Sequence, residues 1–515
     1  MTSADLVLLN GDIITMNPKM PSAQAIAIKG NKILYVGHNQ EVKQYIDTKT
    51  QIIYLKGKTV LPGFIDTHAH VVDYGKMLTW LNLEEVSSIK EIQTQLTERI
   101  KKVDKNKWIL GRALTPEKLL EKRLPTCHEL DIIAPDNPVA FYCRTGQVCI
   151  VNSKALEIAN ISQQTDYGIE RTSMGTPTGV LHDQATNFVW NIIPEPTQQE
   201  LYEATELALE NFVQSGITSI HWIVLSETEL PIIQKLVKTN SLPLRVYLIV
   251  PTNLLDLALQ NLKQLENERF KLGGAIIFTD GYLASRTAAL LKPYSDNSKD
   301  QGRMLYSQNE LIAIANRIQN AGLQIIIHAV GDQAVQETVN VIQHINRNPT
   351  VPPPRIEQAA VLNQQLINCI KKLNISVSIQ PCVIASEFSV WSAKERLGEK
   401  RVCWLFPVKT LLNCGVLVSA GSDCPMEPLN PLLGVNAAVK RKDAQNMSTF
   451  EALQMYTILA AQGTSEIINK GSIEQGKIAD ITILSNNPLS ATVDELYRIF
   501  TCFTILDGIV YRSKK

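Results

Sequence analysis

The sequence has no pattern of paired cysteines and no excess of charge of either sign. Its nine cysteines are scattered without one C-x-x-C spacing, and a disulfide framework is not expected in so large a chain. Lysine plus arginine and aspartate plus glutamate both number 50, so the formal charge is zero. This balance provides no basic surface for nucleic acid and no polybasic run for a membrane. The expected partner is therefore a small-molecule substrate of weak or mixed charge.

Long hydrophobic runs are also missing. No apolar stretch reaches the ~20 residues that a membrane helix needs. The first residues, MTSADLVLLNGDIITMNPK, have no basic segment followed by a long apolar one, so no signal peptide is expected. We therefore expect a cytoplasmic protein with reduced, buried thiols. Hydrophobic residues still make up 45% of the 515 positions, which is enough for a large core and for more than one domain.

Short apolar segments rich in β-branched residues alternate with helical patterns through the middle of the chain. Capping-box spacings at Thr197 with Glu200 and at Ser307 with Glu310 predict helices over 200–214 and 310–321. Eight such units predict an α/β protein with a (β/α)8 TIM barrel. An open doubly wound sheet is the alternative, but no glycine-rich phosphate loop supports it. The predicted barrel strands are residues 64–70, 217–222, 244–250, 274–280, 323–329, 355–361, 375–381 and 416–423.

Both ends of the chain are rich in predicted strands. Residues 5–36 predict a small β-meander, and 476–489 and 502–513 have the same character. We expect the two termini to form one small β-sandwich domain, whose exposed edge would allow a homodimer. Its parts are assigned to 1–57 and 466–515, and the metal-dependent barrel to 58–465. The segment of about 75–200 is too long for one connection, so we interpret it as an insertion after the first barrel strand, lying over the barrel mouth.

Residues that commonly bind metals stand at the ends of several predicted strands. His68 and His70 share one face of the first strand, roughly 6–7 Å apart along the chain. His328 ends the fifth strand and Asp423 the eighth. Because barrel chemistry lies at the C-terminal ends of strands, these four residues predict a site for one divalent ion, with Zn²⁺ preferred and Fe²⁺ or Mn²⁺ as alternatives. Taken singly, His328 could be a core histidine and Asp423 a helix cap.

Asp423 is also the predicted catalytic residue. As a ligand-site carboxylate it could take the proton of an attacking water and pass it to a leaving nitrogen. Three further strand-end residues are candidates for binding substrate. Asp280 could orient a ligand or simply form a turn, and Arg286 could bind a substrate carboxylate or form a structural salt bridge. His221 could line the pocket or be a hydrogen-bonded core histidine.

The sequence resembles the amidohydrolase superfamily, in particular its YtcJ-like branch of metal-dependent hydrolases (amidohydrolase family 3). The resemblance covers nearly the whole chain and implies a metal-dependent (β/α)8 barrel beside a sandwich made from both chain ends. It also implies hydrolysis of a C–N bond in an amide, formamide or cyclic amide by a metal-activated water. The segments that carry the resemblance include VLPGFIDTHAH, FTDGYLASRTAALLKPY, LQIIIHAVGDQAV, RIEQAAV and SAGSDCPMEPLNPL.

The sequence departs from the family pattern at three positions. Ile276 stands where many relatives have a lysine that can bridge two metals, Gln358 replaces a histidine on the sixth strand, and Gln147 replaces a histidine in the insertion. One interpretation is a mononuclear site in which Gln358 is a neutral donor to substrate or bound water. The other is a degenerate site in a small-molecule-binding homologue. A deaminase of an amino-heterocycle, which uses similar ligands, is a further alternative.

Overall fold

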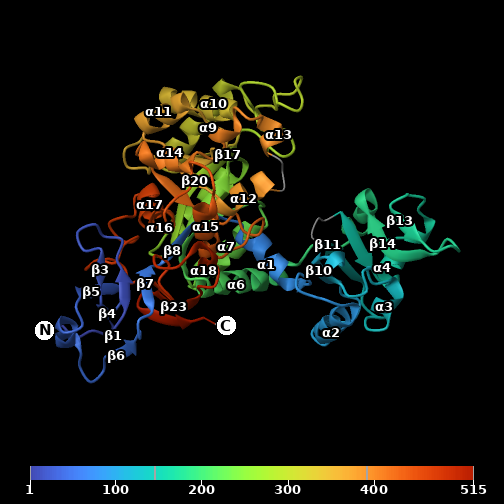
Figure 1. Ribbon diagram of the computed structural model, residues 1–515, viewed down its shortest axis with the longest axis horizontal. Coiled ribbons are helices and arrows are strands. Elements are labelled where there is room, and N and C mark those ends of the chain that lie inside the picture. The colour runs from blue at the N-terminus through green and yellow to red at the C-terminus, as the bar shows by residue number, and fades with distance from the viewer. Residues whose placement is uncertain (1, 144–146, 390–392, 514–515) are drawn as a thin grey trace. The chain divides into compact units, whose positions relative to one another are not determined.

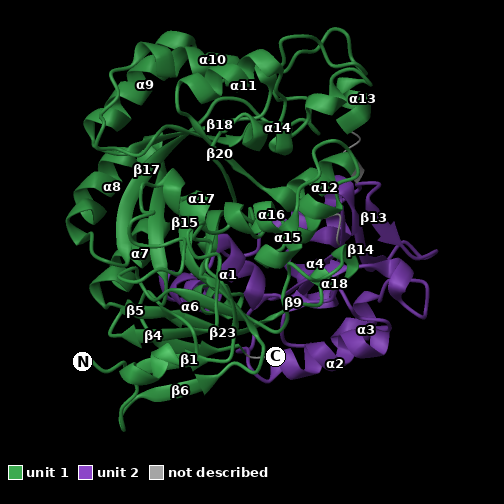
Figure 2. Ribbon diagram, turned by 60° about the vertical axis from the view of Figure 1, so that its left-hand side comes forward, with its two compact units in different colours: residues 1–71, 209–515 green, residues 72–208 purple. Residues whose placement is uncertain are grey.

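The computed structural model describes residues 2–143, 147–389 and 393–513. The chain divides into two compact units, residues 1–71 with 209–515 and residues 72–208 (Figure 2). The first unit contains the long central sheet and both chain ends. The second is a separate α/β unit with its own core.

The central sheet has eight parallel strands, hydrogen-bonded to one another in chain order. A parallel bridge between Ala69 and Cys424 connects the end of the first strand to the residues that follow the last. The sheet is therefore a nearly closed barrel, which confirms the predicted fold class. Its strands are β8 (Phe64–Ala69), β15 (Ile217–Ile223), β16 (Arg245–Pro251), β17 (Phe270–Phe278), β18 (Gln324–Ala329), β19 (Arg355–Gln358), β20 (Ser376–Ile379) and β21 (Val418–Ala420).

Helices connect successive barrel strands, as the alternating pattern predicts. Figure 1 shows α9, α10 and α11 side by side next to the barrel sheet. The two capping boxes are present, because the side chains of Thr197 and Ser307 accept from the backbones of Glu200 and Glu310, and each glutamate accepts in return. Both helices begin two residues before the predicted start, directly after the cap. The helices are α6 (Gln198–Gln214), α7 (Glu229–Lys238), α8 (Leu255–Leu262), α9 (Gln308–Asn320), α10 (Asp332–His344), α11 (Gln364–Lys372), α12 (Pro381–Ser389), α14 (Val408–Asn413) and α15 (Pro431–Lys440).

The two chain ends form a pair of sheets that share one core. Leu8 and Ile26 of the first sheet and Val60 and Ile481 of the second belong to the same buried cluster. The first sheet contains β5 (Lys32–Gly37), β4 (Ala25–Lys29), β1 (Leu6–Leu9) and β6 (Gln51–Tyr54). The second contains β24 (Ile509–Arg512), β23 (Thr501–Leu506), β22 (Ile481–Leu484), β7 (Thr59–Pro62), β2 (Asp12–Ile14) and β3 (Ser22–Ala23).

The prediction of a simple meander over residues 5–36 is wrong. β1 and β2 follow each other in the chain but lie in different sheets. The backbone changes direction at Asn10, whose φ is 56°. It then passes Leu55 so closely that a Cβ on Gly11 would lie 2.3 Å from Leu55 Cδ1. Because β1 is covered on both faces, its sequence lacks the alternation that would identify its partners.

The unit of residues 72–208 contains the segment predicted as an insertion. Phe141 and Tyr142 are neighbours on one strand but belong to different buried clusters, so both faces of its sheet are covered. The strands, in sheet order, are β13 (Ile169–Arg171), β14 (Pro177–His182), β12 (Val148–Val151), β11 (Val139–Cys143), β10 (Ile109–Leu114) and β9 (Leu81–Asn82). The helices include α2 (Ile89–Ile100), α3 (Cys127–Asp131) and α4 (Ser153–Ile158). That this unit covers the barrel mouth stays a prediction.

Two expectations from composition can be compared with the structure. All nine cysteines are free thiols, but only four of them are buried and Cys403 is exposed, so the expectation of buried thiols holds in part. Within the described part of the chain, no helix combines the length and the apolar character needed to cross a membrane.

A buried ion-pair network joins the start of the barrel strands to the terminal sheets. Arg245, at the first position of β16, donates to Asp480 at 2.7 and 3.2 Å and also pairs with Asp507. Arg269 donates to the second oxygen of Asp507 at 2.8 Å. Arg245 and Asp480 are only 5% and 6% exposed, so little solvent screens the network.

We expect Asp480→Ala to destabilise the protein by about 3–5 kcal/mol, because it leaves the Arg245 guanidinium buried without its main partner. Urea unfolding followed by circular dichroism measures the change. The control is Glu399→Ala, since Glu399 pairs with Lys394 at the surface and the two side chains are 78% and 64% exposed. A loss for Asp480→Ala no larger than that of the control would contradict the prediction.

Candidate metal centre

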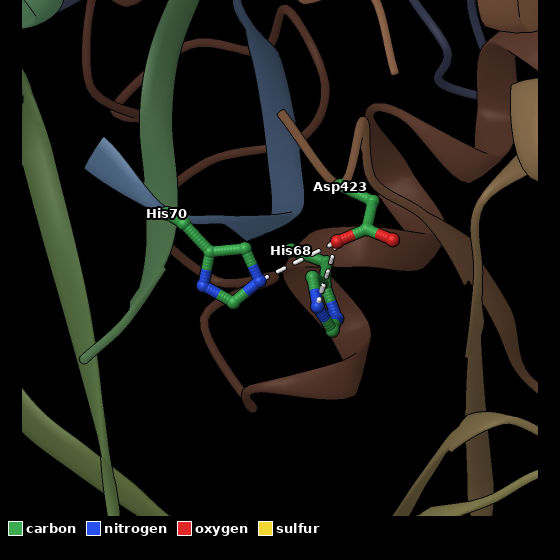
Figure 3. A group of neighbouring side chains, drawn as sticks. All are labelled: His68, His70 and Asp423. Carbon is green, nitrogen blue, oxygen red and sulfur yellow. Dashed lines mark ion pairs between the residues drawn. The ribbon is translucent and has the colours of Figure 1, made fainter. Parts of the chain in front are cut away.

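The end of β8 brings two imidazoles to one carboxylate. Nε2 of His68 and Nε2 of His70 each lie 3.4 Å from Oδ1 of Asp423 (Figure 3). One ligand atom from each of the three residues lies within 4.8 Å of the other two. His68 and His70 are 3% and 8% exposed, so the group is largely shielded from water. Two neutral nitrogen donors and one oxygen donor suit Zn²⁺, Fe²⁺ or Mn²⁺.

The opposite nitrogen of each imidazole faces a hydrogen-bond acceptor. Nδ1 of His68 lies 2.9 Å from Oε2 of Glu357, and Nδ1 of His70 lies 3.2 Å from the carbonyl oxygen of Ile223. Carboxylate and carbonyl oxygens only accept, so each Nδ1 is the donor, and Nε2 is the nitrogen that faces Asp423. Histidines that bind metals are oriented in this way. The donor set and its surrounding contacts thus fit a divalent metal ion.

The loop after β21 is held against β8 by backbone hydrogen bonds. The amide of Asp423 donates to the carbonyl of His68 at 2.8 Å, and the amide of His70 donates to the carbonyl of Cys424 at 2.9 Å. Asp423 has a φ of 62°, a strained conformation for a non-glycine residue that is typical of functional sites. Burial opposes ionisation of Asp423, but hydrogen bonding by His70 and the charge of His68 lower its pKa. The carboxylate is therefore available as an anionic ligand.

Gly421 permits this close approach of the two strands. A Cβ on this residue would lie 2.4 Å from the backbone nitrogen of His68 and 2.7 Å from its Cβ. Beside it, Oδ1 of Asp66 accepts from the amides of His68 at 3.1 Å and Ser422 at 2.9 Å. The first and last barrel strands are thus connected at the level of the metal-ligand candidates.

A buried charge network lies behind His68. Glu357 is fully buried and pairs with both His68 and Arg355. Burial opposes its ionisation, but the charges of Arg355 and His68 lower the pKa of Glu357 to about 2. Nη1 of Arg355 lies 2.7 Å from Nδ1 of His221. Because burial and Arg355 hold the pKa of His221 well below its usual value, His221 is a neutral core acceptor here.

His328 lies close to this network but outside the three-residue group. It is not among the residues whose ligand atoms lie within 4.8 Å of one another in the described part of the chain. It stands opposite Glu357 in the pairing of β18 with β19, and its Nδ1 has no hydrogen-bond partner among the described residues. Burial, followed by the charge of His68, lowers its pKa to about 4, so the imidazole is neutral. That His328 binds the metal stays a prediction.

Two of the weaker candidates make structural interactions. The carboxylate of Asp280 accepts from the amides of Ala289, Val330 and Gly331 at 2.8–2.9 Å, so it fixes two loops at the barrel mouth. Arg286 forms an ion pair with Asp296 at 2.8 Å. The structure therefore brings neither residue into the His68–His70–Asp423 group. Both contacts match the structural alternatives that the sequence left open.

The two substituted barrel positions differ in their surroundings. Ile276 is 1% exposed and belongs to an apolar cluster with Ile223, Tyr247, Ile249 and Ile326. Gln358 has a φ of 74° and is 5% exposed. None of the hydrogen bonds found among the described residues involves its side-chain amide, although its backbone lies in β19. Gln358 is thus a nearly buried polar side chain whose amide takes part in none of those hydrogen bonds.

Sequence reasoning missed three residues that build the site, Arg355, Glu357 and Gly421, and it also missed Tyr282, a neighbour of His328. Glu357 stands beside Gln358 in the sixth strand, but its bond to His68 could not be inferred from spacing. A signal was present, because arginine and glutamate two residues apart in a short apolar strand indicate a buried ion pair. The phenol ring of Tyr282 lies 5.7 Å from the ring of His328, measured between centroids.

Comparisons with known proteins find similarity over almost the whole chain. A family model described as "Amidohydrolase family" matches residues 51–511. The chain is 30% identical to YtcJ of Bacillus subtilis and 25% identical to an N-substituted formamide deformylase of Arthrobacter pascens, with 98% of each chain covered in both cases. It also resembles the crystal structure of an uncharacterized metal-dependent hydrolase from Pyrococcus furiosus, with a TM-score of 0.76 and 28% identity over 94% of this chain and 100% of that one.

Glu357→Gln is expected to weaken metal binding about 10- to 100-fold, because it removes the anionic acceptor that orients His68. Competition with a chromophoric chelator measures the affinity. The control is Glu387→Gln, which changes another buried glutamate. Burial raises the pKa of Glu387 to about 7. No hydrogen bond found among the described residues joins it to the three-residue group. Equal affinities for the two variants would contradict the prediction.

Gly421→Ala should both destabilise the protein and weaken metal binding, since the added methyl group displaces His68 from Asp423. We expect a loss of about 1–3 kcal/mol, as for overpacking of other tight sites. Thermal unfolding with and without added Zn²⁺ measures both effects. Gly463→Ala is the matched control, because its new Cβ would have no neighbour nearer than 3.9 Å. Retention of full metal-dependent stabilisation by Gly421→Ala would contradict this assignment.

Proposed function

The chain belongs to the amidohydrolase family, and from this premise we propose that it hydrolyses a C–N bond of a small amide, formamide or cyclic amide. The observation that carries the proposal is the convergence of His68, His70 and Asp423 at one end of the barrel. The formamide class has further support, because a relative covered over almost its full length is named an N-substituted formamide deformylase.

The proposed cofactor is one divalent ion, preferably Zn²⁺, held by His68, His70 and Asp423. Such an ion supplies a Lewis acid that activates water and polarises the substrate carbonyl. The fit rests on the two Nε2 atoms that face Asp423, since Glu357 and the carbonyl of Ile223 orient the two rings. His328 would complete the ligand set or remain a neutral neighbour of the substrate.

Asp423 is the proposed proton carrier. Its Oδ1 faces the two imidazoles, whereas Oδ2 points away from both (Figure 3). Oδ2 can take the proton of the attacking water and deliver it to the leaving nitrogen. The nitrogen needs this proton in order to leave as a neutral amine. The lowered pKa of Asp423 keeps the carboxylate ionised and ready to accept.

Gln358 is the proposed neutral contact for the substrate. A side-chain amide can donate two hydrogen bonds and accept at its oxygen, which suits the complementary groups of an amide. Because its side chain is nearly buried without a partner in the described residues, binding of such a group would satisfy it. The strained backbone at Gln358 is consistent with a functional position.

Two other functions have a specific observation in their favour. The nitrogen-rich metal site also suits a deaminase of an amino-heterocycle, which would release ammonia. The losses at Ile276, Gln358 and Gln147 favour a non-catalytic homologue that binds a small molecule. We prefer the hydrolase, because the apolar cluster around Ile276 removes a second-metal position while the first group stays intact.

The test combines elemental analysis with a panel of amides, formamides, hydantoins and amino-heterocycles. We expect about one bound metal per chain and hydrolysis of at least one amide or formamide. His68→Ala should lose metal, and Asp423→Asn should reduce kcat about 10²- to 10⁴-fold, since it removes the proton carrier. Asp256→Asn, which changes an exposed ion pair on α8, is the control.

Each alternative has its own outcome in the same experiment. Ammonia release from an amino-heterocycle would identify a deaminase. Absence of bound metal together with absence of metal-stimulated turnover would support the binding homologue. Unaltered hydrolysis of a confirmed substrate by both His68→Ala and Asp423→Asn would refute the assignment of these residues.

A further inference from the structure

A phenol stands beside the metal-centre candidates, and no described residue forms a hydrogen bond with its hydroxyl. Tyr282 follows β17, and its ring meets the ring of His328 edge-on, with 5.7 Å between centroids and an interplanar angle of 68°. The residue is 57% exposed. Among the described residues, only its backbone atoms take part in hydrogen bonds. Its hydroxyl is therefore free to meet a ligand.

A short series of contacts connects Tyr282 to the metal centre. His328, which the phenol touches, pairs with Glu357 across neighbouring parallel strands, and such strands lie about 4.8 Å apart. Glu357 in turn accepts from His68 at 2.9 Å. The phenol thus lies at the same end of the barrel as the proposed metal ligands, on the side of His328.

The backbone that carries Tyr282 is firmly held. Its amide donates to Oγ1 of Thr287 at 2.9 Å, and its carbonyl accepts from the amide of Thr287 at 3.0 Å. Two residues earlier, the buried carboxylate of Asp280 accepts from the amides of Val330 and Gly331. These bonds fix the backbone from which the exposed side chain of Tyr282 extends. Such an arrangement favours a role in binding or chemistry.

The phenol is suited to donate rather than to accept. The ordinary pKa of a tyrosine hydroxyl is about 10. The hydroxyl is therefore protonated near neutral pH. A protonated hydroxyl in this place can stabilise negative charge as it develops on a substrate oxygen.

We propose that Tyr282 is a catalytic residue whose hydroxyl donates a hydrogen bond to the reacting carbonyl oxygen of the substrate. The proposal rests on the proposed function, since it assumes that a carbonyl reacts at the His68–His70–Asp423 group. Packing of the ring against His328 alone would be the structural alternative. A substitution by phenylalanine distinguishes the two roles, because it keeps the ring and removes only the hydroxyl.

The decisive comparison is Tyr282→Phe against Tyr294→Phe in the metal-loaded protein. Tyr294 lies in the same loop, is 1% exposed and donates its hydroxyl to the carbonyl of Ala288 at 2.8 Å, so its loss should affect stability only. For Tyr282→Phe we expect kcat to fall about 10²- to 10³-fold, with metal content unchanged. A kcat within twofold of the wild type, with any value of KM, would overturn the proposal.

A binding measurement separates this proposal from the proposed function. Acetohydroxamate carries a carbonyl oxygen and can bind to a metal site without being hydrolysed. In calorimetry, Tyr282→Phe should bind this probe about tenfold more weakly than the wild type and Tyr294→Phe, as expected for loss of one hydrogen bond. Equal affinities would overturn the role of Tyr282. Failure of the wild type to hydrolyse any amide would instead count against the proposed function.

Discussion

The site depends on the close approach of the first and last barrel strands. Two backbone hydrogen bonds, from Asp423 to His68 and from His70 to Cys424, join the loop after β21 to the end of β8. They are feasible because Gly421 has no side chain at the point where the two strands meet. The same contact closes the barrel and positions the carboxylate between two imidazoles. The same two hydrogen bonds therefore close the barrel and assemble the candidate metal centre.

A buried pair of charges, Glu357 and Arg355, orients His68. An isolated glutamate inside a barrel would be protonated, because desolvation disfavours its ionised form. Arg355 and His68 reverse this preference for Glu357 and keep it an anionic acceptor. The arginine also donates to His221, which remains neutral. The barrel interior thus keeps an ionised glutamate beside His68, and this acceptor orients the imidazole.

The sequence was sufficient for the barrel and for the pair on its first strand, because both follow from local periodicity. His68 and His70 share a face by alternation alone, and the chain order of the strands is the order in the sheet. The partners of strand-end acids could not be predicted in this way. Asp280 and Asp423 each follow a barrel strand by two or three residues. Three backbone amides donate to the carboxylate of Asp280, whereas two imidazoles approach that of Asp423. Only tertiary contacts distinguish them.

The interior of the barrel is divided into a polar and an apolar part, and this division bears on the number of metal ions. The polar part contains β8, β19 and the loop after β21, which carry the metal-ligand candidates and the Glu357 network. The apolar part contains Ile223, Ile249, Ile276 and Ile326 of β15 to β18. A second cation there would be surrounded by hydrocarbon, which stabilises no charge. Isoleucine at position 276 thus matches its apolar surroundings, and it gives no reason by itself to infer lost activity.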